Sequence, residues 1–456
     1  MRVLRTLGLC AVMALPATAD IIVDWAEVTL DAIRTQRQAP VLAARSMAMV
    51  GIAMYDSVNF LDRGHEPYLD LSGILLLGPA SAEAAVACAA HTVLSNLYPD
   101  QAEFLDAEFA TSLAAIPDGL AKTNGLALGL EVGTRVLALR ANDGSSATVP
   151  YVIGDQPGDW QPTPPAFVQT PLQPHWPDVT PFCLPSGSAL RRNPPPALDS
   201  FEYTVAFNEV KAIGSADSTV RTVDQTQIAF FWVDGPGTAT PPGHWWQIAR
   251  DVGAAQGNTL VDNARLFALI GLAVADAGIC SWDAKYAYNF WRPVTAIRAA
   301  DTDGNPDTEA DPGWTSLIPT PPFPAYTSGH STFSSAASKI LALFYGRDDI
   351  AFTTTSDDVP GVSRSYASFS AAGDEAGRSR IYGGIHWEFD NVHALANGRE
   401  LAGAVFADFL QPRDRGVVVV PLESVLNCGL FGLVPLMLLA PALLGLRVVV
   451  VPRRRR

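Results

Sequence analysis

The sequence is poor in cysteine and in basic side chains, and each shortage limits what the protein can be. Five of the 456 residues are cysteines, and Cys10 and Cys428 fall in terminal segments that have the character of processing signals. The other three, Cys88, Cys183 and Cys280, are an odd number at wide spacing. That pattern excludes a disulfide framework and a cysteine metal site, although a single bridge is feasible in an oxidising compartment.

The shortage of positive charge argues against nucleic acid as a partner. Between residues 20 and 420 the chain has 24 basic and 45 acidic residues, a net charge of −21. Proteins that bind a phosphate backbone carry a basic surface, and we therefore expect no nucleic-acid partner. Any anion site must be a local positive pocket in an acidic protein.

Alternation of apolar and polar residues over strand lengths is also missing. Apolar residues instead recur at three- and four-residue spacing from about 23 to 142 and from 199 to 410, which is typical of helices. A hydrophobic content of 48% with 17% charged residues indicates a folded core. We predict an all-α protein with two packed helical bundles, at 20–143 and 199–412.

The segment between the two predicted bundles, 144–198, is rich in proline and aromatic residues and has no helical period. It is too long for a simple connection, so we interpret it as an ordered excursion over the surface that lines a site. Two further long loops are expected at 300–326 and 353–361, with no strands.

Both ends of the chain predict export. Residues 1–19 combine Arg2 and Arg5 with an apolar run and a small-residue ending, the pattern of a signal peptide. In the C-terminal segment 413–456, the stretch from Ser424 to Leu446 has no charge and is long enough to cross a bilayer. The arginines that follow it predict a cytoplasmic C-terminus.

This C-terminal segment resembles the PEP-type sorting signals of bacteria, which a membrane peptidase recognises and removes. Glu423 stands close to where that class often has Pro-Ala, so membrane insertion is better supported than cleavage. We expect a single anchor helix before processing, and a location in the periplasm or at the cell surface of a bacterium.

Two short stretches in the C-terminal half place cations and a helix start near one another. In SWDAKYAYNFWRP, Lys285 and Arg292 are seven residues apart, which predicts one helix face among aromatic residues, ending at Pro293. In the second stretch, Ser328 has the position of a helix cap, with Gly329 and His330 as the first helical residues. The free N–H groups and partial positive charge of a helix start attract anions. Taken alone, Ser328 is better explained as a plain N-cap.

The third stretch, GRSRIYGGIHWEFDN, repeats this arrangement. Arg380 precedes the helix-breaking pair Gly383-Gly384, and His386 is predicted in the first turn of the next helix. Asp390, one turn later, lies on the same face and could orient His386. Together the three stretches predict a site for a tetrahedral or trigonal-bipyramidal oxyanion, built from Lys285, Arg292, Ser328, Gly329, His330, Arg380 and His386. A hydrolase dyad of Ser328 and His330 is disfavoured, because the two are too close along the helix start.

These residues carry a resemblance. Lys-x6-Arg-Pro, Ser-Gly-His and Ser-Arg-x5-His-x3-Asp, in this order, resemble the three-part signature shared by type-2 phosphatidic acid phosphatases, bacterial acid phosphatases and vanadium-dependent haloperoxidases. Thr327 stands where these proteins usually have proline. FWRPVTAIR, PFPAYTSGH, SRIYGGIHWEFD and the stretches at 40–60 and 234–246 resemble the haloperoxidase branch. The membrane phosphatases embed the motifs in transmembrane helices, and we expect none here outside the tail.

The resemblance implies a role for each residue. Vanadate would be the cofactor, a Lewis acid bound through His386, with its oxygens held by Lys285, Arg292, Ser328, the Gly329 N–H and Arg380. His330 would be the acid–base group, Lys285 would polarise the peroxide, and Asp390 would orient His386. Hydrogen peroxide and halide would be the substrates, a small organic molecule would accept the hypohalous acid, and Trp282 and Phe323 would line the halide pocket.

Two alternatives stay open at this point. Phosphate has the charge and shape of vanadate and competes for such a site, so the same residues could hydrolyse phosphate esters. His386 would then form a phosphohistidine while His330 protonates the leaving group. The chain could also be a surface-anchored helical protein with an idle site, although every motif residue is present.

Overall fold

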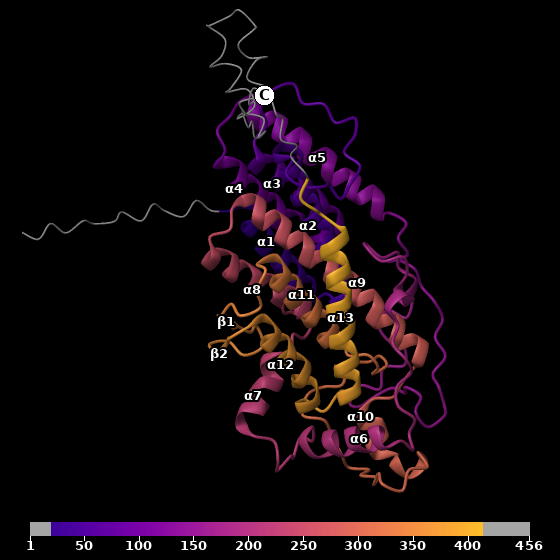
Figure 1. Cartoon of the computed structure of the whole chain (residues 1–456). Coiled ribbons are helices and arrows are strands. Elements are labelled where there is room, and N and C mark those ends of the chain that lie inside the picture. Colours follow the sequence, from indigo (N-terminus) through magenta and orange to yellow (C-terminus); the bar gives the residue numbers. More distant parts are fainter. Residues whose placement is uncertain (1–19, 414–456) are drawn as a thin grey trace, which may run out of the picture.

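The computed structural model describes residues 20–413, and most of this range is helical (Figure 1). The N-terminal half contains α1 (Ile21–Gln36), α2 (Pro40–Asp62), α3 (Ala82–Leu97), α4 (Ala102–Ala114) and α5 (Leu120–Arg140). The C-terminal half contains α6 (Phe201–Ile213), α7 (Val223–Phe231), α8 (Thr240–Gln256), α9 (Leu260–Tyr288), α10 (Pro293–Arg298), α11 (Gly329–Phe344), α12 (Phe369–Tyr382) and α13 (Glu388–Asp408). Short 3-10 turns lie at Pro99–Gln101, Trp176–Asp178, Gly187–Leu190 and Ala300–Thr302. The predicted all-α fold is confirmed, whereas the predicted signal peptide and anchor lie outside the described residues.

Helices α2 and α9 form the centre of the molecule, because both are apolar on nearly every side. By length and composition alone, each could cross a membrane, which the sequence prediction did not anticipate outside the tail. Their most apolar windows are 89% and 100% buried inside the protein, so here they serve as core helices. Where they cross, a Cβ on Gly51 would lie 3.1 Å from the Cα of Ala268, so a glycine there permits the close approach.

The large hydrophobic core runs through both halves of the chain and includes buried residues of α2, α3, α9 and α11. A second, smaller core gathers aromatic side chains such as Tyr203, Trp291 and Trp387 beneath α6 and α10. The helices on either side of the proline-rich segment thus share one continuous core. The bounds assigned to the two bundles from sequence stay a prediction.

The proline-rich segment 144–198 is fastened to α9. Asp276 accepts hydrogen bonds from the backbone N–H groups of Phe182, Cys183 and Leu184 at 2.6, 2.8 and 2.9 Å. Further along α9, Arg191 makes a two-pronged salt bridge to Asp283 at 2.6 and 2.7 Å. These contacts hold the segment in one place, in agreement with an ordered excursion.

A short β-hairpin and the state of the three described cysteines were not settled by the sequence. The loop predicted at 353–361 contains part of a hairpin, in which β1 (Phe352–Thr355) pairs antiparallel with β2 (Ser363–Tyr366), so the prediction of no strands was wrong here. Four-residue strands are too short for alternation to be visible in sequence. Cys88, Cys183 and Cys280 are all free, so the feasible single bridge does not form among the described cysteines.

Candidate oxyanion-binding site

Lys285 and Arg292 reach the site from two helices rather than one. Helix α9 ends at Tyr288, because Asn289 takes the left-handed conformation (φ 50°). Arg292 is extended and caps α10, as expected for a residue before proline. The predicted shared helix face was therefore wrong. The turn nevertheless places the Lys285 ammonium 5.1 Å and the Arg292 guanidinium carbon 4.8 Å from the centre of the Phe323 ring.

The start of α11 is as predicted. Ser328 is the N-cap and its hydroxyl accepts from the N–H of Ser331, so Gly329 and His330 are the first helical residues. A Cβ on Gly329 would lie 3.2 Å from the Trp282 ring, closer than side chains normally allow. Glycine here lets the helix start approach the aromatic wall of the site.

The turn between α12 and α13 presents Arg380 and His386. Gly384 has φ +78°, and a Cβ there would lie 2.2 Å from the Gly214 carbonyl oxygen, so this turn requires glycine. Helix α13 begins at Glu388, two residues later than predicted, and His386 therefore precedes its first turn. Asp390 accepts from the Trp387 N–H at 3.3 Å and from His386 Nδ1 at 2.7 Å.

Hydrogen bonds fix the proton positions on both histidines. Because His386 Nδ1 donates to Asp390, its Nε2 carries the lone pair, which accepts from Arg292 Nη1 at 3.0 Å. His330 Nε2 lies 3.1 Å from the Val233 carbonyl oxygen, which can only accept. The proton of His330 is therefore on Nε2, and its Nδ1 is free to take one up.

The structure brings the predicted residues together in a buried cluster. Lys285, Arg292, Ser328 and Asp390 are fully buried, and Arg380 and His386 are 2% and 3% exposed. His330 and Phe323 are partly exposed, so the cluster faces solvent on their side. The Trp282 and Phe323 rings pack 5.0 Å apart, as expected for one pocket.

The electrostatics of the cluster are dominated by burial of like charges. Burial and then the neighbouring Arg292 lower the pKa of Lys285 well below its ordinary value. Burial lowers the pKa of Arg292 to about 9 and that of Arg380 to about 10. Burial, followed by the three cations, lowers the pKa of His386 well below its ordinary value, which keeps the ring neutral.

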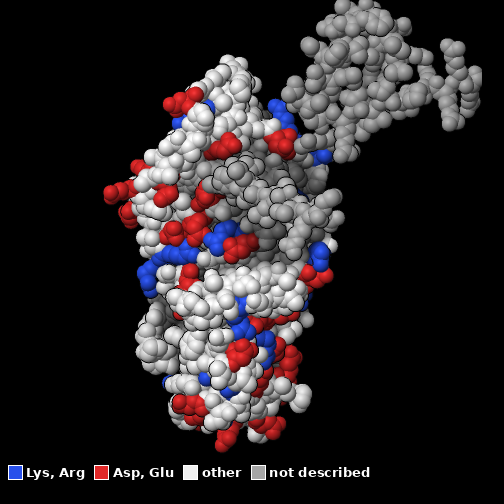
Figure 2. All heavy atoms as spheres, turned by 90° about the vertical axis from the view of Figure 1, so that its left-hand side faces the viewer, with Lys and Arg blue, Asp and Glu red and all other residues white. Residues whose placement is uncertain are grey.

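The carboxylate of Asp390 bonds to His386 inside the cluster, whereas the charges of Asp234 and Asp358 act on Arg380. Burial raises the pKa of Asp390 to about 7, although Lys285 and the Trp387 N–H favour the charged form. Three buried basic side chains converge here, in a protein with more acidic than basic residues, which are mixed on the face shown in Figure 2. Buried charges are normally compensated, so convergence of three basic groups favours an anion as their partner.

Free hydrogen-bond donors in the cluster fit the same ligand. Arg292 Nη2 and Arg380 Nε are buried without a partner, while other nitrogens of both side chains are bonded to protein atoms. Buried donors are rarely left unpaired. Vanadate or phosphate would satisfy them, and the neutral Nε2 of His386 suits a bond to vanadium. The residues present therefore fit the oxyanion that the sequence predicted.

Sequence reasoning missed the residues that support the cluster through their backbone. The Trp232 carbonyl accepts from Arg380 Nη1 at 2.6 Å, and the next carbonyl, of Val233, holds His330. The Leu172 carbonyl of the proline-rich segment accepts from Trp282 Nε1 at 3.3 Å and from Tyr286 at 2.5 Å. Carbonyl groups leave no signal in side-chain identity, so only the fold could assign these contacts.

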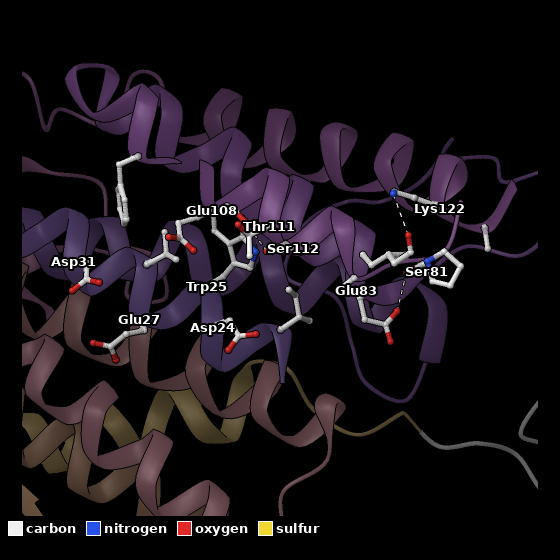
Figure 3. Close-up of a pocket in the computed structure, with 17 residues that line it drawn as sticks. Asp24, Trp25, Glu27, Asp31, Ser81, Glu83, Glu108, Thr111, Ser112 and Lys122 are labelled. Atoms are coloured by element: carbon white, nitrogen blue, oxygen red, sulfur yellow. Dashed lines mark hydrogen bonds between the residues drawn. The ribbon is translucent and has the colours of Figure 1, made fainter. Parts of the chain in front are cut away.

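A large cavity lies elsewhere, beside α1 and α4. It measures about 1010 Å³, and none of the predicted site residues lines it. Figure 3 shows Asp24, Glu27, Asp31 and Glu108 around it, with Trp25 among them. Its acidic lining opposes an oxyanion, so size alone does not identify the site here.

Comparisons with known proteins agree with this geometry. Residues 265–414, which contain all three motifs, match the family model described as "VCPO second helical-bundle domain". The chain is 34% identical to the vanadium chloroperoxidase of Curvularia inaequalis over 44% of its own length, and the match spans 43% of that protein. The chain therefore matches less than half the length of this curated relative.

Solved structures extend the likeness to most of the chain. A bacterial vanadium-dependent iodoperoxidase superposes with a TM-score of 0.76 and 28% identity, covering 88% of this chain and 98% of that one. A bacterial vanadium-dependent chloroperoxidase in its apo form shares the fold at a TM-score of 0.65 and 16% identity, covering 81% and 94%. With the three motifs assembled around one buried oxyanion site, these likenesses support a place for the chain among the vanadium-dependent haloperoxidases.

Proposed function

We propose that this protein is a vanadate-dependent haloperoxidase, which oxidises a halide with hydrogen peroxide to a hypohalous acid. The observation that carries the proposal is the convergence of buried basic side chains around the neutral Nε2 of His386, with two guanidinium nitrogens that have no partner. The iodoperoxidase and chloroperoxidase likenesses support the same reaction class.

The residues would divide the work of holding the cofactor. His386 would bond to vanadium through Nε2, with Asp390 fixing the ring and its proton. Lys285, Arg292, Arg380, the Ser328 hydroxyl and the Gly329 N–H would hold the oxygens and neutralise their charge. When bound, vanadate supplies a Lewis acid that activates peroxide without changing its own oxidation state.

Proton transfer falls to His330. Its Nδ1 is free, its ring is fixed by Val233, and burial followed by the Arg380 charge lowers its pKa well below the ordinary value. A neutral imidazole of this kind accepts a proton from incoming hydrogen peroxide and returns it to a leaving oxygen. Lys285 would polarise the peroxide, and Trp282 and Phe323, whose rings lie beside the Lys285 ammonium, would form the apolar side on which a halide approaches.

The test is an assay of the purified protein with vanadate, hydrogen peroxide and bromide, using a phenol indicator for halogenation. The expected result is oxidation that requires vanadate and is abolished in His386→Ala. The same preparation is assayed with p-nitrophenyl phosphate without vanadate. Phosphatase turnover that vanadate inhibits, with no halogenation, would replace the proposal by the phosphohistidine reaction.

We also propose that the protein body is exported and held at the membrane by its C-terminal segment until a sorting peptidase acts. The sequence patterns at 1–19 and 424–446 support this. The test is protease treatment of intact and lysed cells. Digestion of the body only after lysis of the inner membrane would contradict export.

A further inference from the structure

A short loop before α3 exposes two large aliphatic side chains. Residues 71–80, LSGILLLGPA, contain no charge. Ile74 and Leu76 pack against the core, whereas Leu75 and Leu77 are 86% and 88% exposed. Leu120 at the start of α5 is 57% exposed, and its side chain would lie 3.2 Å from a Cβ on Gly78. We call Leu75, Leu77 and Leu120 the apolar tip, because exposed apolar side chains that gather in one region mark interaction sites.

Contacts at both ends keep this loop from collapsing onto the protein. Arg135 Nη1 donates to the carbonyl oxygens of Asp70 at 2.5 Å and Ser72 at 3.1 Å. At the other end, Asn124 Nδ2 donates to the Pro79 carbonyl oxygen at 2.9 Å. The loop is thus held along α5 while its two leucines point outward.

The described chain ends beside the apolar tip. The Arg413 N–H donates to the Gly64 carbonyl oxygen at 2.9 Å, and its guanidinium pairs with Glu66 at 3.0 Å. Arg413 and the loop residues 72–74 line one hollow of about 520 Å³, together with the exposed Arg63. Figure 1 shows the loop before α3 and the start of α5 at one end of the molecule, and α13 runs towards that end.

The sequence that follows supplies the occupant of this surface. Ten residues, 414–423, separate Arg413 from the charge-free stretch Ser424–Leu446. Ten residues span at most about 35 Å, so a bilayer crossed by that stretch lies within reach of the apolar tip. A tether of this length gives the tip a high effective concentration at the membrane.

We propose that this end of the molecule docks on a lipid bilayer, with Leu75 and Leu77 entering the interface and Arg63 facing headgroup phosphates. Helix α13, about 30 Å long, separates His386 at its start from Arg413 beyond its end. The docked orientation therefore turns the oxyanion site away from the membrane. The proposal rests on the C-terminal anchor and is independent of the halogenating activity.

The test uses the full chain in vesicles of phosphatidylcholine and phosphatidylglycerol. A nitroxide is attached in Leu77→Cys or, as the matched control, in Val223→Cys, an 89% exposed position at the start of α7. Figure 1 places α7 at the opposite end of the molecule. Signal from wild-type protein treated with the same label is subtracted. We expect the nitroxide at residue 77 to collide more often with oxygen, which concentrates in the bilayer, than with a water-soluble nickel complex. The nitroxide at residue 223 should collide more often with the nickel complex.

A second measurement needs no label. Amide exchange of residues 71–80 in vesicles should speed up in Leu75→Ser/Leu77→Ser, because losing two leucines weakens docking roughly tenfold or more. Val223→Ser should leave that exchange unchanged. Equal nickel access at residues 77 and 223 would overturn the proposal, and so would failure of the full chain to float with vesicles.

Discussion

The hydrogen bond that His386 donates to Asp390 predicts a change in ligand selectivity. Replacing Asp390 with asparagine keeps the size of the side chain but removes its charge, 2.7 Å from His386 Nδ1. A charge-assisted hydrogen bond is worth about 1.5–3 kcal/mol, compared with about 1 kcal/mol for a neutral one. Without this bond, Nε2, the atom expected to bond vanadium, has lower electron density, and the imidazole ring is held less firmly in its orientation. Outer partners of metal-bound histidines typically contribute about 10–100-fold to affinity.

Removing the same charge also relieves repulsion between Asp390 and any bound oxyanion. At about 7 Å and an effective dielectric constant of about 20, this gain is roughly 2 kcal/mol, which nearly cancels the loss. The gain applies equally to vanadate and phosphate, because they have like charge and shape. Only vanadate needs the bond to Nε2, so the ratio of the two affinities isolates that bond.

We therefore expect Asp390→Asn to lower the vanadate-to-phosphate affinity ratio by about 10–100-fold. Both affinities are measured by calorimetry at pH 8, above the pKa of about 7 to which burial raises Asp390. Asp283→Asn is the matched control, since Asp283 is also buried but pairs with Arg191 outside the cluster. An unchanged ratio in Asp390→Asn would refute the reasoning that this carboxylate directs Nε2.

Three further predictions address the proton carrier, the helix start and the fold. His330→Gln should lower kcat by about 10²–10⁴-fold, because it removes the free Nδ1, and it should change the vanadate affinity by only a few fold. Initial rates measure kcat and calorimetry measures the affinity. An unchanged kcat would exclude His330 as the proton carrier. Gly329→Ala should raise the KM for halide, because the added Cβ would lie 3.2 Å from the Trp282 ring. An unchanged KM would show that the Trp282 ring moves to make room for the Cβ. Burial raises the pKa of Asp276 to about 6, above the ordinary value of about 3.9. The protonated carboxyl therefore stabilises the folded protein fully below pH 4, and about 3 kcal/mol of that stability is lost as the pH rises through 6. In Asp276→Asn, the free energy of unfolding, measured with urea, should no longer change over this pH range. At acid pH it should be about 1–3 kcal/mol lower than in the wild type, because the three backbone N–H groups must share one amide oxygen.

The sequence by itself determined the helical fold class and was enough to predict which residues form the oxyanion site. Helical periodicity reports which faces are buried, so the helices of both halves were predictable. The start of α11 was predictable because capping by Ser328 is a local interaction. Charges, glycines and histidines in fixed order were enough to predict an oxyanion site.

Only the tertiary structure decided how those residues meet. Lys285 and Arg292 converge across a break at Asn289, whose left-handed conformation no periodicity could reveal. The tautomer of His330 follows from the Val233 carbonyl, which lies 97 residues away in sequence. The position of the C-terminal exit beside the apolar tip depends on contacts between residues 64 and 413. Each of these is a long-range contact, and a sequence pattern encodes local geometry without the packing that brings distant segments together.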